Sequence, residues 1–272
     1  ARRPKSGGFR PNTSDFNLNC EGVFRLPTKR TNKGSQTAGE NVYSFLRKSI
    51  IELHVKPGLA INLKDLSDFL KVSRSPIRDA LIQLEKDGLV TTAPQKGTFV
   101  SKIDIQRVSD ERFLRACIEE RIVEEFLNIY TERDIDRMQK IIDEQKTAAA
   151  AGDARAFLRL DDKMHAVFFE ATNHPFCLNA VMNMSSHYYR IRLLSLSEPD
   201  IQEQTLNQHR EIMDLVLKKD AEKLKKLLDI HIIEKGAEVN KLKAKHPEIF
   251  TGVVTPPPAK RGIWETDFLK SR

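Results

Sequence analysis

The sequence of 272 residues has few cysteines and aromatic residues and no long apolar segment. Its three cysteines, Cys20, Cys117 and Cys177, are too few and too scattered for a disulfide framework or a thiolate metal site. No apolar run approaches the roughly 20 residues that span a bilayer, so no membrane segment is expected. The N-terminal stretch is basic but lacks the apolar centre of a secretory signal. These absences favour a protein of a reducing cytoplasm.

Positive charge is distributed unevenly along the chain, whose formal net charge is +7. Residues 1–38 carry eight basic and two acidic side chains, and residues 39–103 carry ten and seven. Residues 104–245 carry 23 basic and 26 acidic side chains. The N-terminal excess of positive charge is therefore where an anionic polymer such as nucleic acid would be met.

Two differently patterned blocks lie between two predicted tails. Residues 1–38 are rich in small, polar and basic residues and predict a flexible basic tail. Residues 246–272 contain TPPPAKRG, which cannot continue a helix, and predict a C-terminal tail that includes Trp264 and Phe268. Residues 104–245 show a helical pattern throughout, which indicates an all-α bundle with its own core. The helices expected there are 106–130, 132–150, 154–172, 176–196, 201–218 and 220–245.

Residues 39–103 predict three helices followed by a β-hairpin. The first helix is indicated by helical spacing from Val42 to Leu53, the second by LKDLSDFLKV, and the third by VSRSPIRDALIQLEKDGLV, which stops at Gly88. In the stretch LVTTAPQKGTFVSKI, two β-branched runs flank a turn at residues 94–97. The predicted fold class is thus mostly α: an N-terminal winged helix-turn-helix, followed by an all-helical domain.

The start of the third predicted helix carries two arginines where acidic residues are normally favoured. Arg74 and Arg78 lie one turn apart, and the opposite face is apolar. The N-terminal end of a helix already carries partial positive charge, so an external anion is a natural partner. In a helix-turn-helix this end enters the DNA major groove, where arginine can pair with guanine edges. The alternative is a surface helix with two solvated arginines.

The stretch from LKDLSDFLKV to GTFV resembles the DNA-binding domain of the GntR family of bacterial transcription regulators. The match covers about Asn41 to Ile103, and it departs from the family pattern VSRTPVREAL conservatively, with Ser75 for threonine, Ile77 for valine and Asp79 for glutamate. The resemblance implies that double-stranded operator DNA is contacted by the helix-turn-helix and that the wing tip enters the minor groove. The implied helix-turn-helix contacts are Lys64, Ser73, Arg74, Ser75 and Arg78, and those of the wing are Lys96 and Gly97.

In the helical block, Asp161, His165, His209 and His231 stand out as possible metal ligands. Asp161 and His165 are four residues apart and so share one helix face. Two later antiparallel helices would bring His209 and His231 together. Three imidazoles and one carboxylate suit Zn²⁺, Ni²⁺ or Mn²⁺, with at least one coordination position left open. The spacing alone is also consistent with ordinary hydrogen-bonded or surface histidines.

Two segments of this block, LDDKMHAVFFEATNHP and HREIMDLVLKKDAEKLKKLLDIHI, resemble the FCD ligand-binding domain of the FadR-like branch of the family. The resemblance implies that these four residues bind a divalent metal ion, with zinc favoured. Met164 replaces the usual phenylalanine, which changes packing only. Arg115 matches the family's arginine in LRACIEE and is expected to face a small carboxylate effector. Tyr188 and Arg192 are expected to line the same pocket.

These features predict a DNA-binding transcription regulator rather than an enzyme. The expectation is a metabolite-responsive repressor that binds a palindromic operator as a homodimer in the bacterial cytoplasm, on the nucleoid when DNA-bound. Three alternatives stay open: a metallohydrolase with a fused DNA-binding anchor, a regulator for which the metal itself is the signal, and a purely structural metal.

Overall fold

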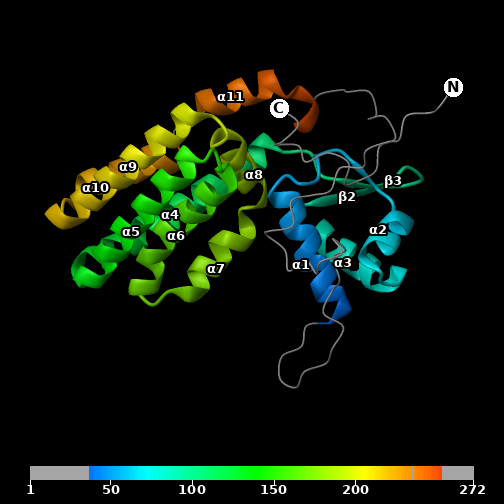
Figure 1. Cartoon of the computed structure of the whole chain (residues 1–272), viewed down its shortest axis with the longest axis horizontal. Helices are drawn as coiled ribbons and strands as arrows, with labels where there is room; N and C mark the ends of the chain where they lie inside the picture. Colours follow the sequence, from blue (N-terminus) through cyan, green and yellow to red (C-terminus); the bar gives the residue numbers. More distant parts are fainter. Residues whose placement is uncertain (1–36, 234–235, 253–272) are drawn as a thin grey trace. The chain divides into compact units, whose positions relative to one another are not determined.

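The described residues of the computed structural model are 37–233 and 236–252 (Figure 1). They divide into two compact units, one that ends at Lys102 and one that covers Ile103–Thr251. Most of the predicted basic tail, 1–38, lies outside the described residues, as do Trp264 and Phe268. The mostly helical fold class is confirmed in both units.

The first unit is a winged helix-turn-helix with a small antiparallel sheet (Figure 1). The strand order is β1-β3-β2, so the predicted hairpin has an additional two-residue strand at its edge. Sequence patterning missed this strand because two residues show no alternation. The elements are α1 (Ala38–Ile51), β1 (Ala60–Ile61), α2 (Leu63–Leu70), α3 (Arg74–Lys86), β2 (Val90–Ala93) and β3 (Gly97–Val100).

Local signals in the sequence account for where these helices begin. Thr37 and Glu40 form a capping box at the start of α1, and the Asn62 side chain accepts the backbone N–H of Lys64 at the start of α2. The apolar stripes of the three helices then meet in one core. Its fully buried members include Val42, Leu66, Ile77 and Leu84. Each such side chain contributes about 1.5–3 kcal/mol by leaving water.

The wing turn uses backbone conformations that few residues adopt. Gln95 has φ 62° and Gly97 has φ 108°, and the N–H of Lys96 donates to the carbonyl of Ala93 at 3.1 Å. A residue with a Cβ is strained at the φ of Gly97, so glycine is required there. The register pairs Ala93 with Gly97, which leaves residues 94–96 at the tip.

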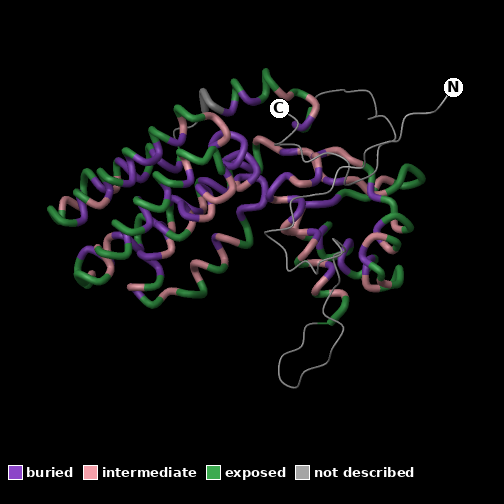
Figure 2. The backbone as a smooth tube through the Cα atoms, viewed as in Figure 1, coloured by how far each residue is buried: buried purple, intermediate pink, exposed green. Residues whose placement is uncertain are grey.

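The second unit is built from helices in its described part. α4 contacts α6, α8 and α10, and α9 contacts α5 and α10. Buried residues line the inward faces of these helices (Figure 2). The elements are α4 (Ile105–Ile129), α5 (Glu132–Ala150), α6 (Ala154–Ala171), α7 (Pro175–Met184), α8 (Ser186–Ser195), α9 (Pro199–Lys218), α10 (Ala221–Ile232), α11 (Gly236–Lys245) and the 3₁₀ turn η2 (Pro247–Ile249).

Two of the predicted helices are broken in the structure. The helix predicted at 176–196 is α7 and α8, which meet at Ser185 with φ −94° and ψ 33°. A carboxylate from α4 holds the break, because Glu111 Oε2 accepts the backbone N–H groups of His187 and Tyr188 at 2.9 and 2.7 Å. The helix predicted at 220–245 is likewise α10 and α11.

The start of the predicted C-terminal tail is also structured, which corrects the boundary at residue 246. Ile249 and Phe250 are fully buried. The N–H of Ile103 donates to the carbonyl of Ile249 at 2.8 Å, and the N–H of Thr251 donates to the carbonyl of Ile103 at 2.9 Å. Residues 249–251 therefore clamp the first residue of the helical unit.

Candidate functional site

The N-terminal end of α3 presents two arginines to solvent. Ser73 occupies the N-cap position, but its side chain forms no capping hydrogen bond. Arg74, Ser75 and Arg78 are exposed. Among the described residues, neither Arg74 nor Arg78 has a hydrogen-bond or ion-pair partner, and the first turn of α3 contains no acidic residue. This helix end is therefore electropositive and available to an anion.

The other predicted DNA contacts are exposed on the same unit. Lys64 is in the first turn of α2, and Lys96 and Gly97 are at the wing turn. Exposure leaves the side chains of Lys64 and Lys96 and the backbone of Gly97 free to reach DNA, and the contacts themselves stay a prediction.

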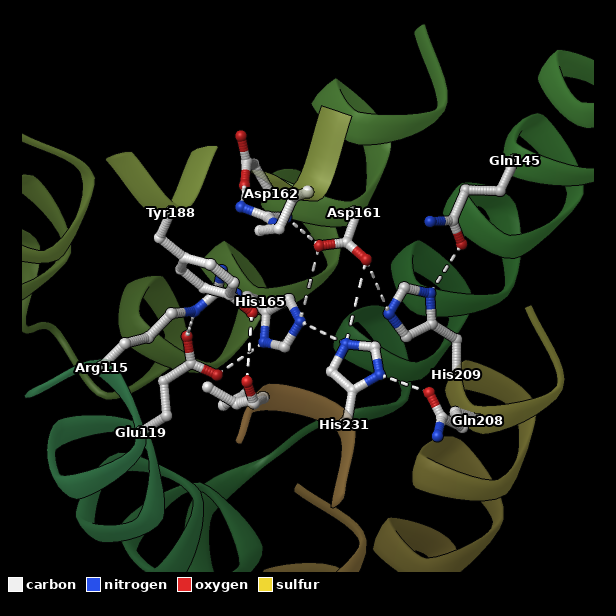
Figure 3. A network of polar contacts seen from close by, with 12 residues as sticks. Arg115, Glu119, Gln145, Asp161, Asp162, His165, Tyr188, Gln208, His209 and His231 are labelled. Atoms are coloured by element: carbon white, nitrogen blue, oxygen red, sulfur yellow. Dashed lines mark hydrogen bonds and ion pairs between the residues drawn. The ribbon is translucent and has the colours of Figure 1, made fainter. Parts of the chain in front are cut away.

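Three helices bring the four predicted metal ligands to one buried point. Asp161 and His165 come from α6, His209 from α9 and His231 from α10. One ligand atom from each of the four residues lies within 4.8 Å of the others, and all four side chains are buried (Figure 3). Asp161 Oδ1 is 3.3 Å from His209 Nε2 and 3.9 Å from His231 Nε2, and Asp161 Oδ2 is 3.8 Å from His165 Nε2.

The outward-facing nitrogen of each imidazole meets a side-chain oxygen. His165 Nδ1 is 2.6 Å from Glu119 Oε2 (Figure 3). His209 Nδ1 is 2.8 Å from Gln145 Oε1, and His231 Nδ1 is 2.8 Å from Gln208 Oε1. Carboxylate and amide oxygens only accept, so each Nδ1 carries the proton and each Nε2 presents a lone pair. Such oxygen partners are the usual outer support of metal-binding histidines.

The resulting set of inward lone pairs fits a divalent cation. His165 Nε2 and His231 Nε2 are 3.1 Å apart, and two lone pairs repel at that distance. His209 Nε2 is buried and has no hydrogen-bond partner, although Asp161 is near. A cation at the common point would satisfy all three nitrogens and the carboxylate together. Neutral imidazole and carboxylate are donors suited to Zn²⁺, which with these four ligands would take an external oxygen by expanding to five-coordination.

The ionisation of these groups agrees with that donor set. Burial opposes a charged Asp161, but the Arg192 guanidinium outweighs burial and holds the pKa of Asp161 well below its usual value. Burial lowers the pKa of His209, which favours its neutral form. Burial also opposes a charged Glu119, yet Arg115 and His165 lower the pKa of Glu119 to about 2.

A small pocket lies beside this centre. Asp161 and His231 belong to its lining, and so do the three predicted effector residues Arg115, Tyr188 and Arg192. The other lining residues are Arg112, Ile191, Ser195, Leu196 and Thr205. The sequence therefore predicted residues of one pocket, but it missed Arg112, Ser195 and Thr205. Helical spacing from predicted site residues could have found all three. Arg112 precedes Arg115 by three residues, Ser195 follows Arg192 by three, and Thr205 precedes His209 by four.

Two of the three pocket arginines already pair with carboxylates. Arg115 Nε donates to Glu119 Oε1 at 2.6 Å. Arg192 Nη1 donates to Asp162 Oδ1 at 2.6 Å, and Nη2 donates to Asp161. The guanidinium carbons of Arg112, Arg115 and Arg192 lie 5.1, 5.8 and 5.5 Å from the centre of the Tyr188 ring, which packs against all three.

Comparison with known proteins supports both units. Residues 38–100 match the family described as bacterial regulatory proteins, gntR family, and residues 112–234 match the FCD domain. HTH-type transcriptional repressor RspR of Escherichia coli (strain K12) is 25% identical over 217 residues, which cover 80% of this chain and 95% of that protein. A Streptomyces ambofaciens protein described as an uncharacterized HTH-type transcriptional regulator in unstable DNA locus is 28% identical over 232 residues, which cover 85% and 98%.

Solved structures share the fold. Escherichia coli McbR/YncC aligns with a TM-score of 0.64 at 16% identity, over 77% of this chain and 100% of that one. A putative transcriptional regulator GntR from Rhodococcus sp. RHA1 aligns with a TM-score of 0.62 at 22% identity, over 76% and 98%.

A winged helix-turn-helix joined to a helical domain with a buried pocket defines a DNA-binding transcription regulator. The chain belongs to the GntR family and carries an FCD domain. It is a regulator and not an enzyme, so the metallohydrolase alternative is not retained. Among the helices of the described residues, none is long and apolar enough to cross a membrane.

Proposed function

We propose that this regulator is a repressor that binds a palindromic operator as a homodimer, and that a small carboxylate bound beside a divalent metal ion changes its affinity for DNA. The observation that carries this proposal is the convergence of four buried ligand atoms at the edge of an arginine-lined pocket. A relative at 25% identity that is named a repressor supports the sign of regulation. Its site of action is the bacterial cytoplasm, where the nucleoid lies.

The proposed DNA contacts lie at the start of α3, on α2 and on the wing. Arg74 and Arg78 reach base edges or phosphates in the major groove, because the start of the recognition helix enters that groove in this class of domain. Ser73 and Ser75 bind phosphate at the same helix end. Lys64, which lies on α2, also binds a phosphate, because the point charge of a lysine is enough for such a contact. Lys96 and Gly97 carry the wing tip into the minor groove. Dimeric binding to two half-sites would make the operator palindromic.

The residues that would hold the metal are Asp161, His165, His209 and His231. When bound, a zinc ion supplies a Lewis-acidic position at which a carboxylate oxygen can coordinate. The chain's own residues supply the rest of the site. Arg115 and Arg192 keep their positive charge close to the pocket, and the Tyr188 ring lies beside both guanidinium groups.

A route from the pocket to the start of the helical unit runs through α8. Tyr188 and Arg192 of α8 line the pocket. At the N-terminal end of the same helix, His187 Nδ1 accepts the backbone N–H of Asp104 at 3.1 Å. A ligand that shifts α8 would therefore act on the segment that leads from the DNA-binding unit. Such coupling between two sites is usually worth 1–3 kcal/mol, or about 5–150-fold in affinity.

Fluorescence anisotropy with labelled promoter fragments tests the proposal. The zinc-loaded chain should bind at least one duplex from its own genome about 10³-fold more tightly than random duplex. Addition of the correct carboxylate should then change that affinity within the coupling range given above. Failure to bind any duplex at low ionic strength, with each divalent metal supplied, would overturn it. A full response to metal alone, without organic acid, would instead establish the metal as the signal.

A further inference from the structure

One arginine of the pocket differs from the other two because no carboxylate pairs with it. Arg112 is 7% exposed, and its Nε atom has no hydrogen-bond partner among the described residues. Its one ring contact in that part of the chain is with Tyr188, which bears no charge opposite to its own. A buried cation without a counter-ion is costly, so an anion from outside the chain is the expected partner.

Two hydroxyl groups of the same pocket are also buried without partners. Ser195 is 4% exposed and Thr205 is 1% exposed, and neither Oγ of Ser195 nor Oγ1 of Thr205 has a hydrogen-bond partner among the described residues. The two residues come from different helices, α8 and α9, and both line the pocket with Arg112. Hydroxyls in helices usually bond to a backbone carbonyl one turn earlier, as Thr172 does here. Ser195 and Thr205 do not, so they are available to a ligand.

We infer that Arg112, Ser195 and Thr205 form a second binding subsite in the pocket, which selects a carboxylic acid that bears hydroxyl groups. The inference rests on the proposed function, because the same ligand would also reach the metal ligands Asp161 and His231. Arg112 binds an anionic oxygen of the acid. The Ser195 and Thr205 hydroxyls exchange hydrogen bonds with hydroxyls on its carbon chain.

The pairing of groups in the pocket, rather than their net charge, supports an anion at this position. Glu119 pairs with Arg115, and Asp161 together with Asp162 pairs with Arg192. Arg112 is the pocket arginine that no carboxylate contacts among the described residues. An acid without hydroxyl groups would neutralise Arg112 but would leave the hydroxyls of Ser195 and Thr205 without partners. A site built to bond hydroxyls discriminates strongly against a ligand that lacks them.

Matched pairs of acids test the selectivity of the subsite. Isothermal titration of the zinc-loaded full chain would compare propionate with glycerate, succinate with tartrate, and hexanoate with gluconate. In at least one pair the hydroxylated acid should bind tenfold or more tightly than its partner, which corresponds to about 1.4 kcal/mol. Absence of that preference in every pair, or binding of none of the acids, would overturn the inference.

Three variants identify the residues responsible. Ser195→Ala combined with Thr205→Val should remove the preference for the hydroxylated acid and leave the melting temperature of the acid-free protein unchanged or raised. Arg112→Gln should weaken binding of that acid at least tenfold and leave zinc binding unchanged. Arg121→Gln is the matched control, because Arg121 lies on the exposed face of α4, the helix that also carries Arg112. This substitution should change neither acid binding nor zinc binding. A preference that persists in the double variant would contradict the inference.

The same preparations separate failure of this inference from failure of the proposed function. DNA binding by the wild-type chain, measured alongside, tests the proposed function. If the chain binds DNA and zinc but shows no selectivity within any pair, the subsite alone is wrong. If the chain binds no DNA, the regulator proposal fails, whatever the acids do.

Discussion

Nε2 of His165 lies 3.1 Å from Nε2 of His231, although the Nδ1 atom of each ring meets a side-chain oxygen at hydrogen-bond distance. A direct hydrogen bond between the two Nε2 atoms would require one ring to carry a second proton besides the one that its Nδ1 donates. A shared cation resolves this conflict. The contact between these two rings is therefore the clearest sign in the fold of what the centre binds.

Substitution of a ligand histidine should abolish tight zinc binding. Zinc at 100 times its dissociation constant should stabilise the wild-type chain by about 2.7 kcal/mol, and His231→Ala should remove most of that gain because one of the four donors is lost. Thermal unfolding with and without zinc measures both effects. His174→Ala is the matched control, because His174 pairs with Glu125 away from the centre. An unchanged zinc-dependent shift in the His231 variant would rule out the proposed ligand set.

Removal of an outer oxygen partner should weaken zinc binding without changing a ligand. Gln145 accepts from His209 Nδ1 at 2.8 Å and fixes which nitrogen of that ring faces the centre. Gln145→Leu should lower zinc affinity about 10–100-fold, the usual cost of losing such a partner. Competition with a chromophoric chelator measures the affinity. Wild-type affinity in this variant would show that the His209 ring is held by packing alone.

Loss of Arg74 should abolish specific operator binding and leave the fold intact. Its guanidinium has no partner among the described residues, so Arg74→Ala removes no intramolecular contact seen there. Loss of a bidentate base contact should cost about 1–3 kcal/mol of discrimination. Anisotropy and far-ultraviolet circular dichroism together test this. Lys86→Ala, in the last turn of the same helix, removes the same charge and should cost much less.

Tyr43 predicts an alkaline limit to the stability of the DNA-binding unit. Its hydroxyl donates to Asp87 Oδ2 at 2.6 Å and ties α1 to the C-terminal end of α3. Burial, followed by the bond to Asp87, raises the pKa of Tyr43 to about 12 from a usual 10.0. Because the folded-state pKa is raised, this contribution is complete below pH 10 and is lost as the pH rises through 12.

Tyrosinate absorbance during an alkaline titration checks the Tyr43 prediction. One of the four tyrosines should titrate near pH 12, and Tyr43→Phe should remove that component. At neutral pH the same substitution should cost about 0.5–1.5 kcal/mol of stability, the usual worth of one hydrogen bond. A high-pH component that survives in Tyr43→Phe would assign the raised pKa to another tyrosine.

The sequence predicted those parts of the fold that depend on local pattern. The three helices and the wing could be predicted because the apolar spacing, the helix caps and the turn each lie within a short stretch of sequence. The break between α7 and α8 was not, because it contains neither glycine nor proline. Glu111, 76 residues before His187, caps the start of α8 and holds the break. A tertiary contact of that kind has no local signature.

The candidate site also has features that the sequence predicted and features that depend on tertiary contacts. The four ligands were predicted from residue type, spacing and family resemblance. Which arginine of the pocket stays unpaired could not be predicted, since that depends on where Glu119, Asp161 and Asp162 lie in space. The structure pairs Arg115 and Arg192 and leaves Arg112 without a carboxylate among the described residues. Helical spacing alone does not distinguish Arg112 from Arg115 and Arg192.

The clamp at residues 249–251 should be essential for the stability of the helical unit, although it lies beyond the part of the chain that matches the FCD family. Phe250 is fully buried and pairs with Ile103 across two backbone hydrogen bonds that involve Ile249 and Thr251. Phe250→Ala should therefore cost about 3–5 kcal/mol through lost burial and the cavity left behind. Urea unfolding followed by circular dichroism measures the loss. Phe176→Ala is the matched control, because Phe176 is 82% exposed on α7 and its removal should change stability by less than about 0.5 kcal/mol. Equal effects of the two substitutions would mean that residues 249–251 do not hold Ile103 in solution.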